Sequence, residues 1–301
     1  MLIKFLSPKF TKILDRIVKN KDLNLKIRKR VKKFFRYKIK WILNNTKLNI
    51  FYFFLNKRKL SDLIFFQKKN SKGSNHLDLY KVLGDLVEKK KIKKILEIGI
   101  GGHSIEYTGG QSLQVLSFFF NKAKVFGIDI SSKVFLDNNK IKTYICDESD
   151  LKKLKDISSE IGELDIVIDD GSHIPINQKN NFLIFFNKLK DKGIYIIEDI
   201  GSSYEKAFDG DPDLIEESNL VSFFKNYTHC VNSEMLTEKN QKKFGSFIDI
   251  EKIFFFKNSI LIQKRIRNEK PWPNEYAYEN LDAKNKRWEQ NKLRSGLRIY
   301  K

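Results

Sequence analysis

Short apolar segments that end in acidic residues constrain the fold of this chain more than any other feature. Five such segments lie between residues 95 and 197, and helical patterns separate most of them. Apolar strands that alternate with helices at this rhythm indicate a parallel, doubly wound sheet. The segments cover residues 95–98, 125–128, 143–146, 165–168 and 193–197, and the intervening helical patterns cover 110–120, 151–161 and 178–189.

The C-terminal part of this pattern predicts a change of strand direction. Residues 246–256 and 260–264 are apolar segments joined by the turn pair Asn258-Ser259, which is typical of an antiparallel hairpin. The predicted fold class is therefore α/β and Rossmann-like, with a mostly parallel seven-stranded sheet, an antiparallel C-terminal hairpin and a basic helical N-terminal region.

The distribution of charge divides the chain into three parts. Residues 1–72 hold 22 of the 58 Lys and Arg residues but only three acidic ones, so this arm carries +19 of the formal net charge of +21. The remainder is nearly neutral. We expect a basic helical arm over residues 1–72, a domain over 73–265 that follows a polar linker, and a polar tail over 266–301.

The arm contains a basic amphipathic helix pattern. Apolar residues at spacings of three and four within 23–45 predict one apolar helix face, and Lys and Arg cover much of the rest. Residues 1–66 could bind an anionic membrane surface, pack on the domain, or contact a second copy of the chain, and we expect a homo-oligomer. A general bias toward lysine would give a similar charge. Nucleic acid is a less favoured partner, because no arrangement of aromatics typical of RNA stacking is recognisable.

The segments that mark exported or spanning proteins are not apparent in the sequence. Charged residues and a proline interrupt residues 1–10, and the longest uncharged apolar stretch in the arm is too short to span a bilayer. Cys146 and Cys230 cannot form a disulfide framework and suit a reducing compartment. We expect a cytoplasmic protein, with a peripheral position at the inner membrane face if the arm binds lipid.

The acidic residues predict where the functional site lies. Ligands of open parallel sheets bind outside the carboxyl ends of the strands. In this chain those ends carry Glu97, Asp129, Asp147, the pair Asp169–Asp170 and the pair Glu198–Asp199.

A glycine turn follows the first of these strands. In the sequence LEIGIGG, the residues Gly99, Gly101 and Gly102 let the backbone approach a ligand closely, while Asp129 at the end of the next strand can bind two ribose hydroxyls. The spacing is neither that of a phosphate loop nor that of the dinucleotide fingerprint. Taken alone, the turn and the acid would serve NAD equally well.

The later strand ends predict a metal site. IVIDDGSH places Asp170 and His173 after the fourth strand, and YIIEDIGSSY places Glu198 and Asp199 after the fifth. Carboxylate oxygens without cysteine suit Mg²⁺ or a similar divalent cation. His173, three residues beyond Asp170, is then a candidate general base or an ordinary turn histidine.

These motifs together resemble a known family. LEIGIGG, GGQSL, GIDI, DESD, IVIDDGSH and YIIEDIGSSY occur in one order over residues 70–265, as in class I S-adenosylmethionine-dependent methyltransferases. They resemble most closely the metal-dependent sugar O-methyltransferases of the macrocin and mycinamicin type. The segment KGSNHLDLY also resembles the part of that family where a His and a Tyr approach the site.

The resemblance implies a role for each candidate residue. Asp170, Glu198 and Asp199 would bind Mg²⁺, and His173 would be the catalytic base. The cofactor S-adenosylmethionine would contact Glu97, Gly99, Gly101, Gly102, Ser112, Asp129, Asp147, Glu148, Ser149 and Asp169. Glu148 departs from the family pattern, which usually has Gln, and the arm has no counterpart in it.

The expected function is methylation of a hydroxyl of a sugar in a glycan, glycolipid or glycosylated natural product, as in surface polysaccharide biosynthesis. A catechol-like diol or RNA is an alternative acceptor. A non-catalytic module that binds membrane or nucleic acid on the same fold is an alternative of a different class. Retention of Asp170, His173, Glu198 and Asp199 favours an enzyme.

Overall fold

The structure is a computed structural model, and it describes residues 59–66, 76–102, 108–214, 219–236 and 238–266. The predictions for the basic arm before residue 59 and for the polar tail after residue 266 lie outside these ranges. No helix within the described ranges is long and apolar enough to cross a membrane.

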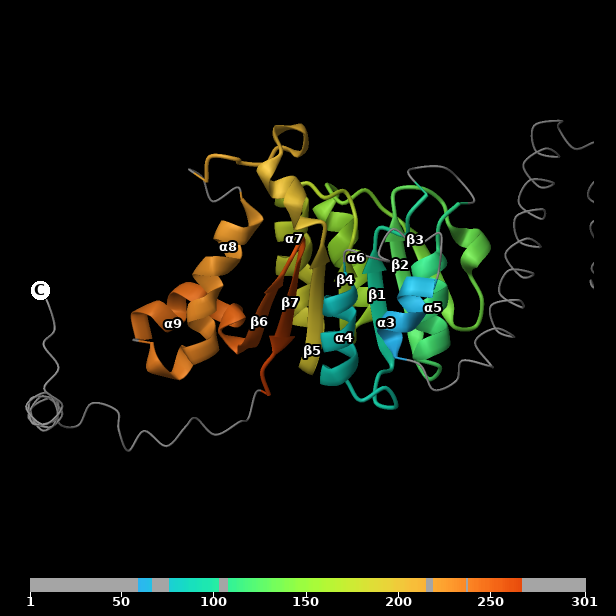
Figure 1. The fold of residues 1–301 in the computed structure, drawn as a ribbon, viewed down its shortest axis with the longest axis horizontal. Coiled ribbons are helices and arrows are strands. Elements are labelled where there is room, and N and C mark those ends of the chain that lie inside the picture. Colours follow the sequence, from blue (N-terminus) through green and yellow to red (C-terminus); the bar gives the residue numbers. More distant parts are fainter. Residues whose placement is uncertain (1–58, 67–75, 103–107, 215–218, 237, 267–301) are drawn as a thin grey trace, which may run out of the picture.

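One seven-stranded sheet organises the described part of the chain (Figure 1). The strand order is β3-β2-β1-β4-β5-β7-β6, and β7 runs antiparallel to both of its neighbours. This arrangement confirms the predicted parallel sheet with an antiparallel C-terminal hairpin. The strands are β1 (Lys94–Ile98), β2 (Lys124–Asp129), β3 (Ile141–Ile145), β4 (Leu164–Asp169), β5 (Leu189–Glu198), β6 (Ile250–Phe256) and β7 (Ser259–Lys264).

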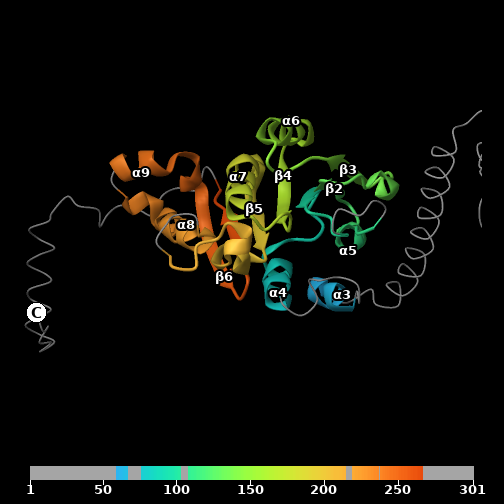
Figure 2. The ribbon, with the colours of Figure 1, turned by 90° about the horizontal axis from the view of Figure 1, so that it is seen from above.

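Helices cover both faces of the sheet, as the view from above shows (Figure 2). One face packs against α3, α4 and α5, and the opposite face against α6, α7 and α8. The α-helices are α3 (Leu60–Phe66), α4 (Leu77–Leu86), α5 (Gln111–Phe119), α6 (Leu151–Ile161), α7 (Pro175–Phe185), α8 (Leu220–Tyr227) and α9 (Glu238–Phe244). The 3-10 helices are η2 (Val134–Leu136), η3 (Phe186–Lys188), η4 (Ile200–Tyr204), η5 (Lys206–Phe208), η6 (Thr228–Met235) and η7 (Gly245–Asp249).

The buried strands explain the two cores. Successive side chains of a strand point to opposite faces, so Ile166 and Ile168 of β4 join the core under α3–α5, whereas Val167 joins the core under α6–α8. Because both faces are covered, the strands are apolar nearly throughout. The two cores hold the carboxyl ends of β1, β2, β4 and β5 in fixed register at one edge.

Several boundaries differ from the sequence prediction. Helix α7 begins three residues earlier than expected, because Pro175 occupies its first turn, where a missing N–H costs nothing. Strand β3 begins at Ile141 rather than residue 143. The first hairpin strand begins at Ile250 rather than residue 246, because residues 245–249 form the 3-10 helix η7.

Helix α3 changes the description of the N-terminal boundary. The sequence division placed residues up to 72 in the arm, but Leu60, Leu63 and Ile64 are almost fully buried in the core that α4 and α5 also line. This helix therefore packs as part of the domain. Most of the basic residues that predicted the arm lie before residue 59.

Candidate active site

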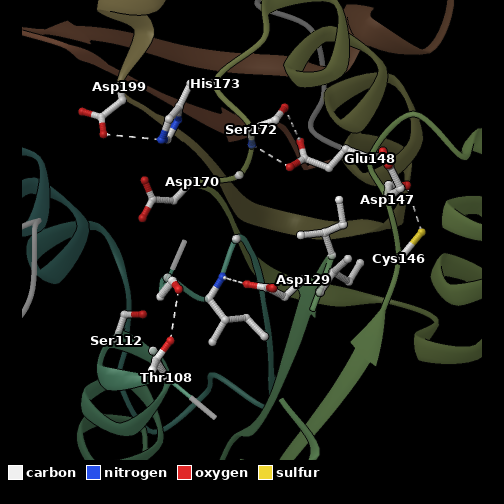
Figure 3. A pocket seen from close by; sticks show the side chains of 18 of the residues that line it. Thr108, Ser112, Asp129, Cys146, Asp147, Glu148, Asp170, Ser172, His173 and Asp199 are labelled. Carbon is white, nitrogen blue, oxygen red and sulfur yellow. Dashed lines mark hydrogen bonds and ion pairs between the residues drawn. The ribbon is translucent and has the colours of Figure 1, made fainter. Parts of the chain in front are cut away.

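A pocket of about 840 Å³ opens at the carboxyl ends of the strands. Its wall combines the turn after β1, the ends of β2 and β3, and the loops after β4 and β5 (Figure 3). The sequence-predicted residues that line it are Gly99, Gly101, Gly102, Ser112, Asp129, Asp147, Glu148, Asp170, His173 and Asp199. The structure thus brings together most of the predicted site.

The glycine turn after β1 serves two different purposes. A Cβ on Gly99 would lie 2.0 Å from the carbonyl oxygen of Asp170, so this glycine allows the β1 and β4 loops to touch. Gly101 also has a positive φ, but a Cβ there would meet no atom of the described residues closer than 4.0 Å. Gly101 therefore leaves open space at the pocket wall, where a ligand can approach the backbone.

Asp129 ends β2 with both carboxylate oxygens in use. Oδ2 accepts a hydrogen bond from the Ile100 backbone N–H at 3.1 Å, and Oδ1 accepts one from the Ser131 N–H at 2.8 Å. The side chain lines the pocket beside the glycine turn. These bonds fix the orientation of the carboxylate that was predicted to bind ribose.

Lys133 was not predicted from the sequence, yet its buried ammonium lies at the back of this wall. Nζ donates to the carbonyl oxygens of Gly101 at 2.8 Å and Thr108 at 3.1 Å, and it lies 3.6 Å from Asp129 Oδ1. Burial lowers the pKa of Lys133, while the charge of Asp129 acts in the opposite direction. One lysine therefore connects both ends of the glycine-rich loop to the acid of β2.

We expect Lys133→Met to weaken binding of S-adenosylhomocysteine and to lower the thermal midpoint. The substitution leaves two backbone carbonyls and Asp129 without this cation, a loss of roughly 1.5–3 kcal/mol for hydrogen bonds that involve a charge. For a domain of this size that loss corresponds to roughly 3–12 °C. Differential scanning calorimetry and ligand titration measure the two effects. Lys122→Met, at an exposed position, is the matched control. An unchanged affinity of Lys133→Met for S-adenosylhomocysteine would contradict a role of Lys133 in supporting the pocket wall.

Glu97 lies behind the pocket rather than on its surface. Its side chain is fully buried, and Oε2 accepts a hydrogen bond from Ser112 Oγ at 2.7 Å. Ser112 itself lines the pocket from the first turn of α5. Glu97 therefore orients Ser112 in this structure, and its predicted contact with the cofactor stays a prediction.

The turn after β3 presents two predicted residues, Asp147 and Ser149, and the unpredicted Cys146 in different ways. Asp147 lines the pocket, and it accepts hydrogen bonds from the Ser149 N–H and hydroxyl, which lower the pKa of its carboxyl. Ser149 is exposed and holds Asp147 in place without lining the pocket. Cys146 is nearly buried at the same wall, and burial raises the pKa of its thiol to about 11.

Glu148 connects this turn to the loop after β4. Its carboxylate accepts hydrogen bonds from the Ser172 N–H at 2.6 Å, the Ser172 hydroxyl at 3.3 Å and Asn181 Nδ2 at 2.9 Å. Burial raises the pKa of Glu148 despite these donors. All three groups donate, so a carboxylate suits the position, and the departure from the Gln of the resembled family has a local structural reason.

Asp169 is fully buried and does not line the pocket. Oδ2 accepts hydrogen bonds from Asn181 Nδ2 at 3.1 Å and the Tyr195 hydroxyl at 3.3 Å. Burial, followed by the nearby charge of Glu148, raises the pKa of Asp169 well above its ordinary value. The structure therefore places Asp169 in the support of the β4 loop, and it does not bring the side chain to the predicted cofactor site.

Asp170, His173 and Asp199 form a cluster at the other end of the pocket (Figure 3). Each offers one ligand atom, and these atoms all lie within 4.8 Å of one another. His173 Nε2 is 3.8 Å from Asp199 Oδ2, and His173 Nδ1 is buried without a hydrogen-bond partner among the described residues. Two carboxylates and an imidazole at this spacing suit a divalent cation that prefers oxygen.

Glu198 is the one predicted metal ligand that the structure does not bring into this cluster. It is fully buried, and Oε1 accepts a hydrogen bond from the Tyr80 hydroxyl at 2.5 Å. His76 lies between the two acids, with Nε2 at 3.3 Å from Asp199 Oδ1 and 3.8 Å from Glu198 Oε2. The His and Tyr of the segment before β1 do approach the site, where they contact the acids at and just after the end of β5.

The backbone at the cluster is unusual. His173 and Asp199 both have positive φ values, 58° and 54°, which cost free energy in residues other than glycine. Ser202 holds them together, because its hydroxyl lies 2.6 Å from the His173 carbonyl oxygen and 3.0 Å from that of Asp199. Such strain is typical of functional sites that the surrounding structure over-determines.

Sequence reasoning missed several residues that shape the pocket, namely Thr108, Gln111, Cys146, Ser172 and Phe208 on its wall, and Lys133, Asn181 and Asn258 behind it. Most belong to loops whose course the strand pattern does not predict. The only available signal was position, since Cys146 and Ser172 lie next to predicted site residues.

Comparison with known proteins agrees with the motif resemblance. No family model matches the chain. A segment of 116 residues is 39% identical to 8-demethyl-8-alpha-L-rhamnosyl tetracenomycin-C 2'-O-methyltransferase of Streptomyces olivaceus, and covers 38% of this chain and 31% of that protein. Demethylmacrocin O-methyltransferase of Streptomyces fradiae and mycinamicin VI 2''-O-methyltransferase of Micromonospora griseorubida are each 38% identical over 120 residues, which is 40% of this chain and 30% of each relative.

A solved structure extends the likeness to the fold. The MycE methyltransferase from the mycinamycin biosynthetic pathway, in complex with Mg, SAH and mycinamycin VI, superposes with a TM-score of 0.61 at 28% identity. The alignment covers 72% of this chain and 57% of MycE. In sequence, the chain matches about a third of the length of its curated relatives. Over the part that aligns, it has the class I methyltransferase fold of MycE and is related in sequence to the macrocin, mycinamicin and tetracenomycin sugar O-methyltransferases.

Proposed function

We propose that this protein is an S-adenosylmethionine-dependent, Mg²⁺-dependent O-methyltransferase that acts on a hydroxyl of a sugar-bearing acceptor. The observation that carries the proposal is one pocket with a nucleoside-type wall at one end and the Asp170–His173–Asp199 cluster at the other. The curated relatives are O-methyltransferases, and MycE was solved with Mg and SAH.

The pocket wall fits the cofactor. Gly101 leaves the backbone accessible, Asp129 is oriented by two backbone N–H groups, and Asp147 presents its carboxylate at the far side. These residues would hold the amino acid, ribose and adenine parts respectively. Glu97 and Asp169 would act behind this wall through Ser112 and Asn181.

The acidic cluster fits a divalent cation. Asp170 and Asp199 would supply the carboxylate ligands from two adjacent strands. Glu198 lies outside this cluster, and its Oε1 accepts the hydrogen bond of Tyr80, so Glu198 would act beside the two ligands or add an oxygen through Oε2. Close carboxylates otherwise raise each other's pKa, and a cation relieves that repulsion.

When bound, the ion would supply a Lewis acid that lowers the pKa of a coordinated acceptor hydroxyl, and the cofactor would supply an electrophilic methyl group. The residues of this chain would bind and orient these groups. Asp170 and Asp199 would fix the acceptor end, while Asp129 would fix the cofactor end. His173 would accept the hydroxyl proton at Nε2, the nitrogen that faces Asp199.

The finer predictions concern the basic arm, the location of the protein and the acceptor. The charge of +19 in residues 1–72 supports attraction to an anionic membrane surface. A cytoplasmic location, assembly with a second copy and a role in polysaccharide biosynthesis are part of the same proposal. A free sugar-bearing natural product is the acceptor class that the curated relatives favour.

Thermal unfolding of the purified protein tests the proposal without a known acceptor. A ligand that binds only the folded state raises the free energy of unfolding by mass action, by about 2.7 kcal/mol at a ligand concentration of 100 times Kd. The thermal midpoint rises with it. We expect S-adenosylhomocysteine to raise the midpoint in a dose-dependent way, and Mg²⁺ to raise it further. No shift with saturating S-adenosylhomocysteine would overturn the methyltransferase proposal, whereas a shift that Mg²⁺ does not extend would overturn only the metal site.

A further inference from the structure

The turn between β6 and β7 lies against the metal-ligating end of β5. Strand β7 pairs antiparallel to β5, and the last pair in the register is Glu198 with Ser259. The next residue beyond each of these strand ends is therefore Asp199 after β5 and Asn258 before β7. The sequence pattern predicts this hairpin only as the edge of the sheet. In the structure, its turn also places the Asn258 side chain beside the acidic cluster.

Asn258 makes three hydrogen bonds around Asp199. Its Nδ2 donates to Asp199 Oδ1 at 2.5 Å, its Oδ1 accepts from the Gly201 N–H at 2.7 Å, and its carbonyl accepts from the Ile200 N–H at 3.2 Å. A Cβ on Gly201 would lie 2.7 Å from Asn258 Oδ1, so the glycine permits this close approach. All three of these hydrogen bonds join Asn258 to Asp199 or to one of the two residues that follow it.

The two carboxylate oxygens of Asp199 face different partners. Oδ1 lies against Asn258 Nδ2 and 3.3 Å from His76 Nε2, whereas Oδ2 faces His173 Nε2 at 3.8 Å. A rotation of the carboxylate would break the bond to Asn258. The donor therefore favours the orientation in which Oδ2 points toward the cluster with Asp170 and His173.

We propose that Asn258 is a positioning residue that orients Asp199 as a metal ligand, an inference that rests on the metal site of the proposed function. Hydrogen-bonded partners behind a metal ligand fix its orientation, and their loss typically weakens metal binding by roughly 10–100-fold. Asn258 is suited to the place for a second reason, because its φ of 63° is one that Asn tolerates better than most residues.

The test uses Asn258→Gly in the 301-residue chain. Glycine adopts a positive φ without strain, so the turn is kept while the amide is removed. We expect the Kd for Mn²⁺, measured by electron paramagnetic resonance, to rise roughly 10–100-fold. Lys257→Ala is the matched control, because Lys257 is exposed in the same turn, and it should bind Mn²⁺ as the unsubstituted protein does.

Titration with S-adenosylhomocysteine separates orientation from general damage. The cofactor end of the pocket does not depend on Asn258, so its affinity should stay unchanged in Asn258→Gly. Mn²⁺ binding is then counted per S-adenosylhomocysteine-competent molecule, which corrects for any unfolded fraction. A wild-type Kd for Mn²⁺ in Asn258→Gly, or equal losses of both ligands, would overturn the proposal. Absence of Mn²⁺ binding in the unsubstituted protein would instead overturn the metal site itself.

Discussion

Asp170→Ala is expected to abolish methyl transfer and to remove specific Mn²⁺ binding while S-adenosylhomocysteine still binds. Asp170 follows β4 directly and supplies one of the two carboxylates in the three-residue cluster. Without it, Asp199 is the one carboxylate left in the three-residue cluster, so the charge and the oxygen ligands that hold a divalent cation are halved. The loss in turnover should therefore approach complete loss at any practical metal concentration.

The fold should survive this substitution. The Asp170 backbone N–H donates to the Ile98 carbonyl at 2.9 Å, and alanine keeps that bond. The thermal midpoint in a chelator should match that of Asp156→Ala, a control on the exposed face of α6. Asp170→Asn, which keeps the shape but removes the charge, should behave like Asp170→Ala. Methylation at the normal rate in Asp170→Ala, or in excess chelator, would contradict a metal-dependent reaction.

The strand ends explain why so much of the site could be predicted. In a parallel sheet, consecutive strands deliver their carboxyl ends to one edge, so linear proximity to a strand end becomes spatial proximity. Asp129, Asp147, Asp170 and Asp199 all line one pocket for this reason. The prediction required only the strand order of an ordinary doubly wound sheet and no knowledge of side-chain contacts.

The same reasoning could not distinguish neighbours on one strand. Adjacent residues point to opposite faces, and a shift of one residue decides between pocket and core. Asp169 and Glu198 end their strands buried, bonded to Tyr195 and Tyr80, whereas Asp170 and Asp199 turn outward into the loops. Which acid of each pair is buried depends on tertiary partners that lie far away in the sequence.

The sequence also did not reveal the contacts that residues of distant elements make with the site. Lys133 is four residues from Asp129 but also binds carbonyls of the β1 loop, and Asn258 is 59 positions from Asp199. Both residues have an ordinary local explanation, one as a lysine in a lysine-rich chain and the other as a turn asparagine. Only the hydrogen bonds of the folded structure show that they support the site.

His173→Asn is expected to lower turnover by roughly 10²–10⁴-fold, the usual contribution of a general base, while metal and cofactor affinities stay within a few-fold of normal. Asparagine is chosen because position 173 has a φ of 58°, which Asn tolerates better than Ala. The amide cannot accept the hydroxyl proton, so the substitution removes the base without adding backbone strain. His173→Ala should lose activity to a similar extent.

The two roles open to His173 give different measurements. As a base, His173 removes the acceptor proton, and its loss changes the rate at saturating metal and the pH profile of kcat. As a third ligand in the cluster, its loss changes the Kd for Mn²⁺ instead. Exposed His229→Asn is the matched control and should change neither quantity. A large rise in the Mn²⁺ Kd of His173→Asn, with the rate restored by excess metal, would assign the imidazole to the ion. The proton would then have to leave through another group.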